Sequence, residues 1–156
     1  MSDTHNIAIL IANGFNEKEL VEIQKSLRAQ DMVPKMVSSE NGVVNGWADN
    51  TWGCFFPVDV SINQALASDF DGLIIMGGDK SIQRLAKTAH TNRFVSSFQR
   101  VEKPVLALDE ASQIIDTETG SVTHLDVSEQ DLTETLTTFI NDVQVSEPEM
   151  ELSIAA

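Results

Sequence analysis

Three short apolar runs constrain the fold of this chain most strongly. They are Ile7 to Ala12, Gly72 to Met76 and Val105 to Leu108, and no charged residue interrupts any of them. A strand that is apolar on both faces is typical of a parallel sheet with helices on either side. The segments between the runs carry apolar residues at helical spacing. The chain therefore predicts an α/β fold with a doubly wound, mostly parallel sheet in three layers.

The remaining segments fill in this architecture. The spacing predicts a helix over 17–29, two helices over 82–101 that break near Thr91, and a last helix capped by Ser128. It also predicts strands over 33–38 and 121–125, a short helix over 61–67, and extended pieces around an Asp49–Asn50 turn. We expect a single domain over 5–145, followed by an acidic flexible tail over 146–156.

Bulk properties narrow the class of protein. A chain of 156 residues is long enough for one well-packed domain. No apolar run approaches the roughly 18 residues that span a bilayer, and the first residues do not resemble a secretory leader. The chain has one cysteine, so it forms no internal disulfide. These features predict a cytoplasmic protein.

The charge is unevenly distributed along the chain. The net charge is −14, and every Lys and Arg lies at or before Lys103. The acidic C-terminal third repels nucleic acid and anionic membranes, so we expect neither as a partner. Two interpretations remain open for this surface. It is either a solvated face that keeps the protein soluble or a docking surface for a protein partner with a basic surface.

Two strand ends carry residues suited to chemistry. Asp109 directly follows the run that ends at Leu108, at a sharp turn from strand to helix, and such an elbow normally displays a catalytic residue. Gly77 and Gly78 follow the run that ends at Met76, where backbone N–H groups would face the elbow. Since the carboxyl ends of parallel strands meet at one edge, we expect these residues to lie together.

Three segments carry a resemblance to a known family. They are Ile7-Ala-Ile-Leu-Ile-Ala-Asn-Gly-Phe15, Asp71-Gly-Leu-Ile-Ile-Met-Gly-Gly78 and Lys103-Pro-Val-Leu-Ala-Leu-Asp-Glu-Ala-Ser-Gln-Ile-Ile115. Together they resemble the ThiJ/PfpI family of the class I glutamine amidotransferase-like superfamily, over about residues 5 to 145. The resemblance implies a flavodoxin-like fold.

The resemblance also implies where family chemistry would lie. In the family a cysteine occupies the elbow, histidine often follows it, and a glutamate after the first strand bonds the thiol. Here those positions carry Asp109, Glu110 and Asn16, while Gly77 and Gly78 occupy the position of the oxyanion donors. The chain therefore resembles a member that has lost its nucleophile, a pseudoenzyme.

The ending is shorter than in catalytic members, and in this the chain resembles the C-terminal domain of large-subunit catalases. The resemblance implies a binding, regulatory or structural module, with a link to stress. It also implies a homodimer. The region of Trp47, Trp52 and Phe56 is the candidate interface.

Two roles for Asp109 stay open. In the first, Asp109 is a structural cap that accepts hydrogen bonds from the Asn16 amide and from backbone N–H groups of the elbow helix. Asn16 would then remove the like-charge repulsion that the family's glutamate would create. In the second, Asp109 and Glu110 serve a hydrolase or an acid/base enzyme. That alternative needs a base, and no histidine fits a motif; the three are His5, His90 and His124.

No cofactor or metal is expected. Asp79, Asp109 and Glu110 have oxygen ligands that suit Mg²⁺ or Ca²⁺, but acidic residues at helix starts are common for electrostatic reasons alone. The loop Ala12–Asn16 has one glycine and no Ser or Thr, which disfavours a flavin phosphate site. Cys54 has apolar neighbours, which predicts a buried, inert thiol.

Overall fold

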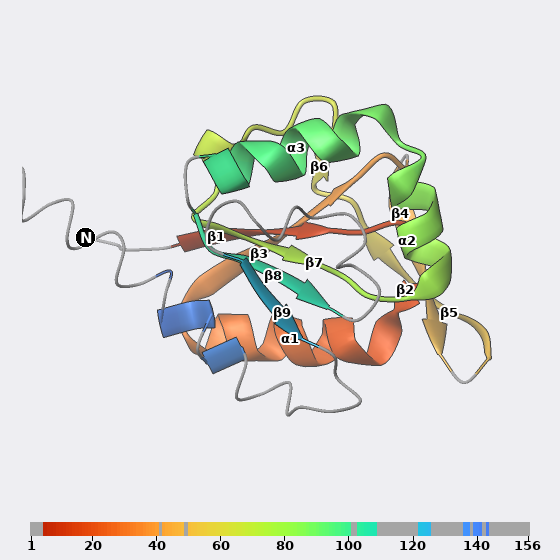
Figure 1. Cartoon of the computed structure of the whole chain (residues 1–156). Coiled ribbons are helices and arrows are strands. Elements are labelled where there is room, and N and C mark those ends of the chain that lie inside the picture. The colour runs from red at the N-terminus through yellow and green to blue at the C-terminus, as the bar shows by residue number, and fades with distance from the viewer. Residues whose placement is uncertain are drawn as a thin grey trace, which may run out of the picture.

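A computed structural model describes residues 5–40, 42–48, 50–100, 103–108, 122–125, 136–137, 139–141 and 143. Its centre is a parallel sheet of six strands in the order β6-β3-β1-β7-β8-β9 (Figure 1). The strands are β1 (His5–Leu10), β3 (Met32–Ser38), β6 (Val60–Ser61), β7 (Gly72–Ile75), β8 (Val105–Leu108) and β9 (Val122–Leu125).

Helices cover both faces of this sheet. Helix α1 (Glu17–Ala29) lies on one face, and α2 (Asp79–Ala86) and α3 (Ala89–Arg100) lie on the other (Figure 1). Side chains of β1 alternate between the two cores: Ile7 and Ile9 pack on the side of α1, whereas Ala8 and Leu10 pack on the side of α3. The apolar runs are thus buried on both faces, and the predicted three-layer, flavodoxin-like α/β fold is confirmed.

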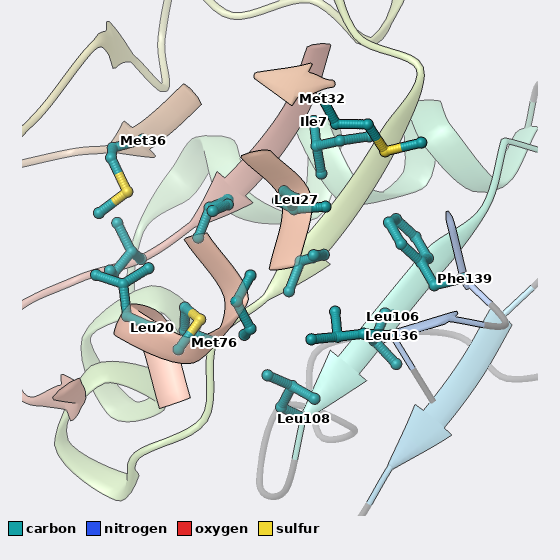
Figure 2. Close-up of a cluster of buried hydrophobic side chains, with 14 of the residues drawn as sticks. Ile7, Leu20, Leu27, Met32, Met36, Met76, Leu106, Leu108, Leu136 and Phe139 are labelled. Carbon is teal, nitrogen blue, oxygen red and sulfur yellow. The ribbon is translucent and has the colours of Figure 1, made fainter. Parts of the chain in front are cut away.

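Figure 2 shows the core on the side of α1, where strand and helix side chains interdigitate. Leu20 and Leu27 of α1 belong to the same cluster as Leu106 and Leu108 of β8. The helical residues near the C-terminal end join it on the same side, namely Leu136, Phe139, Ile140 and Val143. This part of the predicted last helix is confirmed, while its proposed cap, Ser128, lies outside the described residues.

A small second sheet stands beside the main one, in the order β2-β4-β5. It contains β2 (Phe15–Asn16), β4 (Val43–Ala48) and β5 (Thr51–Pro57). The last two form an antiparallel hairpin whose turn includes Asn50 at φ 61°, as the sequence predicts. Asp49 lies outside the described residues. Within the described sheet, β5 is an edge strand and is mostly exposed.

Two predicted elements are wrong in detail. Residues 61–67 do not form a helix, because Ser61 ends strand β6 and the short side chains of Ser61 and Asn63 bond each other in a turn. The only helical turn nearby is the 3₁₀ turn Ala67–Asp69. The break between α2 and α3 falls at Lys87–Thr88, three residues before the predicted Thr91, which is buried in the first turn of α3.

Several boundaries agree closely with the sequence patterns. Helix α1 spans the predicted 17–29, and Asp31 after it adopts φ 61°. Strand β9 covers the described part of the predicted 121–125. Among the described residues, no helix combines the length and hydropathy needed to cross a bilayer. The predicted tail over 146–156 lies outside the described residues.

Candidate functional site

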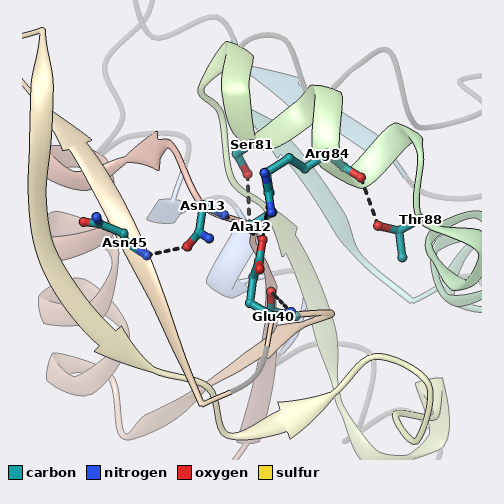
Figure 3. A network of polar contacts seen from close by, with 8 residues as sticks. Ala12, Asn13, Glu40, Asn45, Ser81, Arg84 and Thr88 are labelled. Atoms are coloured by element: carbon teal, nitrogen blue, oxygen red, sulfur yellow. Dashed lines mark hydrogen bonds and ion pairs between the residues drawn. The ribbon is translucent and has the colours of Figure 1, made fainter.

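The loop after β1 is held from two sides at the carboxyl edge of the sheet (Figure 3). The Ala12 N–H donates to the buried Ser81 Oγ of α2 at 3.1 Å. On the other side, the Asn45 N–H of β4 donates to Asn13 Oδ1 at 2.7 Å, and the Gly14 N–H donates to the Asn45 carbonyl at 2.8 Å. The loop is therefore a fixed wall between the main sheet and the hairpin.

A charged contact ties the end of β3 to α2 in the same region. Arg84 Nε donates to Glu40 Oε2 at 2.8 Å, and the Asn13 N–H points to the same oxygen at 3.5 Å (Figure 3). Glu40 is also turned toward its own strand end, because its N–H donates to Ser38 Oγ at 3.1 Å. The loop after β1, the end of β3 and helix α2 thus share one polar network.

The two glycines after β7 lie against this wall, while their predicted approach to the elbow at Asp109 involves a residue outside the described ones. The Asn16 N–H donates to the Gly77 carbonyl at 3.0 Å. Gly78 has φ 114°, and a Cβ built there would lie 2.7 Å from the Gly14 carbonyl oxygen and 3.0 Å from Asn16 N. A side chain has no room at position 78. Asn16, Gly77 and Gly78 are therefore brought together.

Asn16 acts as the N-cap of α1. Its Oδ1 accepts a hydrogen bond from the Glu19 N–H at 3.3 Å, and its backbone is extended. This is the usual arrangement by which Asn satisfies an N–H group of the first helical turn. The side-chain oxygen of Asn16 is thus used locally, within α1.

A pocket of about 460 Å³ opens beside these residues. Its lining comes from the ends of both sheets and from the starts of α1 and α2: Gly14, Asn16, Lys18, Trp47, Ala48, Asn50, Gly78, Asp79 and Lys80. Lys80 Nζ sits 4.7 Å from the centre of the Trp47 ring. The Asp79 carboxylate accepts from Gln83 Nε2 at 2.9 Å. The pocket lies where open α/β sheets place ligands.

Comparison with known proteins identifies the family. The family model described as DJ-1/PfpI matches residues 5–147. The chain belongs to the DJ-1/PfpI family. This confirms the resemblance to ThiJ/PfpI proteins. No curated protein matches the chain in sequence.

Solved structures share the fold. A ThiJ/PfpI domain protein from Brachyspira murdochii superposes with a TM-score of 0.75 at 16% identity, over 90% of this chain and 98% of that one. A Toxoplasma gondii DJ-1, in oxidised form, gives a TM-score of 0.66 at 13% identity, over 94% and 97%.

Some relatives of this DJ-1/PfpI chain are longer. The match covers 70% of this chain but only 32% of a two-domain protein with DJ-1/ThiJ/PfpI-like and ferritin-like domains from Anabaena variabilis, at 24% identity and a TM-score of 0.63. The chain spans 56% of another structure of this fold, at 21% identity and a TM-score of 0.65.

The predicted elbow acids of this DJ-1/PfpI domain lie outside the described residues. Strand β8 ends at Leu108, and Asp109 and Glu110 follow it in the sequence. The hydrogen bond from the Asn16 amide to Asp109 therefore stays a prediction. A metal site that uses Asp79, Asp109 and Glu110 stays equally untested. Within the described residues, no three His, Cys, Asp or Glu side chains gather as metal ligands.

Glu19 is the acidic residue at this edge that the sequence interpretation missed. It is only 6% exposed, although it lies in the acidic first turn of α1. The spacing could have found it, because residue 19 shares a helical face with Ile23 and Leu27, which are both core residues. A buried carboxylate thus lies one turn from the pocket residue Asn16.

Cys54 is not buried. It lies in β5 and is exposed, which corrects the expectation of a buried thiol. Its N–H donates to Glu17 Oε1 at 2.8 Å, and the same side chain fills the space over Gly46 and Gly53. Cys54 is exposed because Glu17 occupies the inner side of the hairpin, while β5 forms the outer edge. The thiol is in the small sheet, not at the end of β8.

Neither His5 nor His90 enters the pocket. His5 begins β1 at the opposite, amino edge of the sheet, where its Nδ1 is 3.5 Å from Asp71 Oδ2. His90 is in the first turn of α3, and neither residue lines the pocket. His124 lies in β9 next to β8, paired in register with Ala107.

Proposed function

We propose that this chain is a non-catalytic DJ-1/PfpI module that binds a ligand or a partner and has lost the sulphur chemistry of its family. One observation carries the proposal. The single cysteine of the chain lies in the exposed strand β5, whereas the residue after β8 in the sequence is Asp109. A thiol at the end of β8 is thus absent by sequence.

The chemistry of the substituted group supports this interpretation. A thiolate is a strong nucleophile, whereas a carboxylate needs a base to activate water and donors to stabilise an oxyanion. Neither His5 nor His90 lines the pocket. We propose that Asp109 instead caps the elbow helix, where a carboxylate at the N-terminus is stabilised by the helix dipole.

Turnover measurements test the proposal. Purified protein is incubated with small esters, amides and aldehyde adducts, beside an Asp109→Ala variant whose folding is checked by circular dichroism. We expect the same background rate for both proteins. Turnover that Asp109→Ala abolishes while the protein stays folded would overturn the proposal.

Stability measurements test whether Asp109 caps the elbow helix. Loss of a helix cap costs about 1 kcal/mol, so Asp109→Ala should lower the free energy of unfolding by that amount, while Asp109→Asn, which keeps an acceptor, should cost less. Equal stability of all three proteins would argue against the cap.

The alternative function is a hydrolase or an acid/base enzyme that uses Asp109 and Glu110. One observation supports this alternative: Glu19 is a buried carboxylate one helical turn from the pocket residue Asn16, although Glu19 itself does not line the pocket. Glu19 also leaves an acidic group at this edge of the sheet, although Asn16 replaces the family's glutamate. If the alternative holds, Glu19→Gln should reduce turnover together with Asp109→Asn. If the module is non-catalytic, neither change affects a rate.

We also propose that the module forms a homodimer through β5. Trp52 is 50% exposed and Phe55 is 67% exposed on this edge strand, and no residue of the strand is charged. Phe56, named in the predicted interface, instead packs its ring 5.6 Å from that of Phe15. Trp47 meets Trp52 edge to face at 5.1 Å. The exposed part of the interface is thus Trp52 and Phe55.

The mass in solution tests the dimer. We expect light scattering to give twice the chain mass, and Phe55→Lys to give a monomer with an unchanged circular dichroism spectrum. Val43→Lys is the control, since Val43 is a similarly exposed apolar residue on β4, at 46%. A monomeric parent protein would refute the proposal. The basic protein partner, the cytoplasmic location and the link to stress stay predictions, and pull-down from lysate at low and high salt tests the first.

A further inference from the structure

We infer that the pocket beside Gly78 binds a small organic acid, with its carboxylate at Lys80 and its apolar body against Trp47. The inference rests on the proposed function, because it names the ligand class for the same edge of the sheet. The pocket volume of about 460 Å³ lies within the range of small-molecule sites.

The charge of the lining favours an anion. Lys18 and Lys80 line the pocket in a chain whose net charge is −14. The one acidic residue among the described lining is Asp79, and its carboxylate is engaged by Gln83 Nε2 at 2.9 Å. The described lining therefore holds two ammonium groups and one carboxylate, where the chain as a whole is acidic, and an anion is favoured there.

Lys80 is held in place before any ligand arrives. A Cβ built on Gly14 would lie 2.4 Å from Lys80 Cβ, so the stem of the lysine packs directly on this glycine. Its Nζ is positioned over the Trp47 ring at 4.7 Å, a cation–π contact. A cation with a restrained side chain loses less conformational entropy on binding than a free surface lysine does.

The start of α2 adds to the same preference. Its N-cap is Gly78, so no side chain of the cap residue satisfies the first N–H groups of this eight-residue helix. Gly78, Asp79 and Lys80 all line the pocket, so the positive end of the helix dipole faces it. The Lys80 ammonium and the N-terminal end of α2 thus both border the pocket.

The lining beside the cation selects for more than charge. The Trp47 side chain, with Ala48 beside it, gives an apolar surface, while Asn16 and Asn50 offer amide groups at the rim. An inorganic anion would leave the indole wall unused. A carboxylate attached to a flat or apolar body uses both parts of the pocket.

Binding of benzoate tests the inference, with benzamide as a neutral molecule of the same shape and inorganic phosphate as an anion without an apolar body. Trp52→Phe leaves Trp47 as the sole tryptophan, so fluorescence reports on the pocket wall. We expect saturable quenching by benzoate and affinity at least about tenfold weaker for benzamide and phosphate.

Two lysine variants locate the charge. Lys80→Met should weaken benzoate binding about tenfold or more. Lys87→Met removes the same charge from the C-terminal end of α2, outside the lining, and should change the affinity by less than about twofold. No saturable binding of benzoate, equal binding of benzamide, or equal effects of the two variants would each overturn the inference.

Tight phosphate binding with weak benzoate binding would also overturn it, since the apolar wall would then play no part. The outcome of the benzoate experiment can be distinguished from the outcome of the turnover experiment. Benzoate binding without turnover supports both proposals, absence of binding without turnover removes only the ligand class, and turnover of any substrate removes the non-catalytic role whatever benzoate does.

Discussion

Gly78→Ala tests the close approach between β7 and the loop after β1. The new Cβ would lie 2.7 Å from the Gly14 carbonyl oxygen and 3.0 Å from both Asn16 N and Phe15 Cα. All three contacts are with backbone, which cannot turn away as a flexible side chain can. The φ of 114° is also a conformation that residues with a Cβ rarely adopt.

The two costs add to a measurable loss. Backbone strain of this kind costs about 1–3 kcal/mol, and overpacking against fixed atoms costs about 1–3 kcal/mol more. We therefore expect a loss of about 2–6 kcal/mol in the free energy of unfolding, measured by urea denaturation. For a chain of this size that corresponds to a fall of roughly 4–24 °C in Tm.

Gly42→Ala is the matched control. Gly42 also has a positive φ, 82°, but a Cβ built there meets no atom within 4 Å. Its substitution carries the strain without the clash and should cost about 1 kcal/mol. If Gly78→Ala is no more destabilising than Gly42→Ala, the described packing of the strand ends is refuted.

Three further changes test the contacts that shape the pocket. Ser81→Ala leaves the buried Ala12 N–H without its acceptor and should lower the free energy of unfolding by about 1–3 kcal/mol in a urea titration. The control Ser97→Ala loses only a hydrogen bond to the Arg93 carbonyl of its own helix and should cost less than about 0.5 kcal/mol. Equal costs would contradict the role of Ser81. Asn16→Ala should lower the free energy of unfolding by about 1 kcal/mol through loss of the α1 cap, and Asn16→Ser, which keeps an uncharged cap oxygen, should restore most of it. A neutral Asn16→Ala would count against the cap. Glu17→Ala removes the acceptor of the Cys54 N–H, so hydrogen exchange of the Cys54 amide should accelerate, while exchange of the β1 amides should stay the same. If the Cys54 amide exchanges at the same rate in both proteins, Glu17 does not hold the hairpin.

Much of the main sheet was predictable because its strands are buried on both faces. Their apolar runs stand out against the rest of the sequence, and the buried stripe of α1 repeats Leu20, Ile23 and Leu27 at helical spacing. The place of Gly77–Gly78 at the carboxyl end of β7 was predictable for a related reason. Glycines directly after a buried strand point to a place where another segment comes close.

The errors arose where local bonds or tertiary contacts decide the outcome. The segment from Ser61 has helical spacing over too few residues, so short polar side chains and pairing with β3 decide its structure. Burial of Glu19 and exposure of Cys54 depend on which way α1 and the hairpin face. The pocket draws on three separate segments, and the contact of Lys80 with Trp47 joins residues that no sequence spacing relates.

The most direct measurement compares hydrolysis progress curves for the purified chain and its Asp109→Ala variant over a panel of small esters, amides and aldehyde adducts. The account predicts that both curves coincide with the buffer blank for every substrate. A wild-type rate clearly above the blank that disappears in the folded variant would contradict it, because Asp109 would then be a catalytic residue.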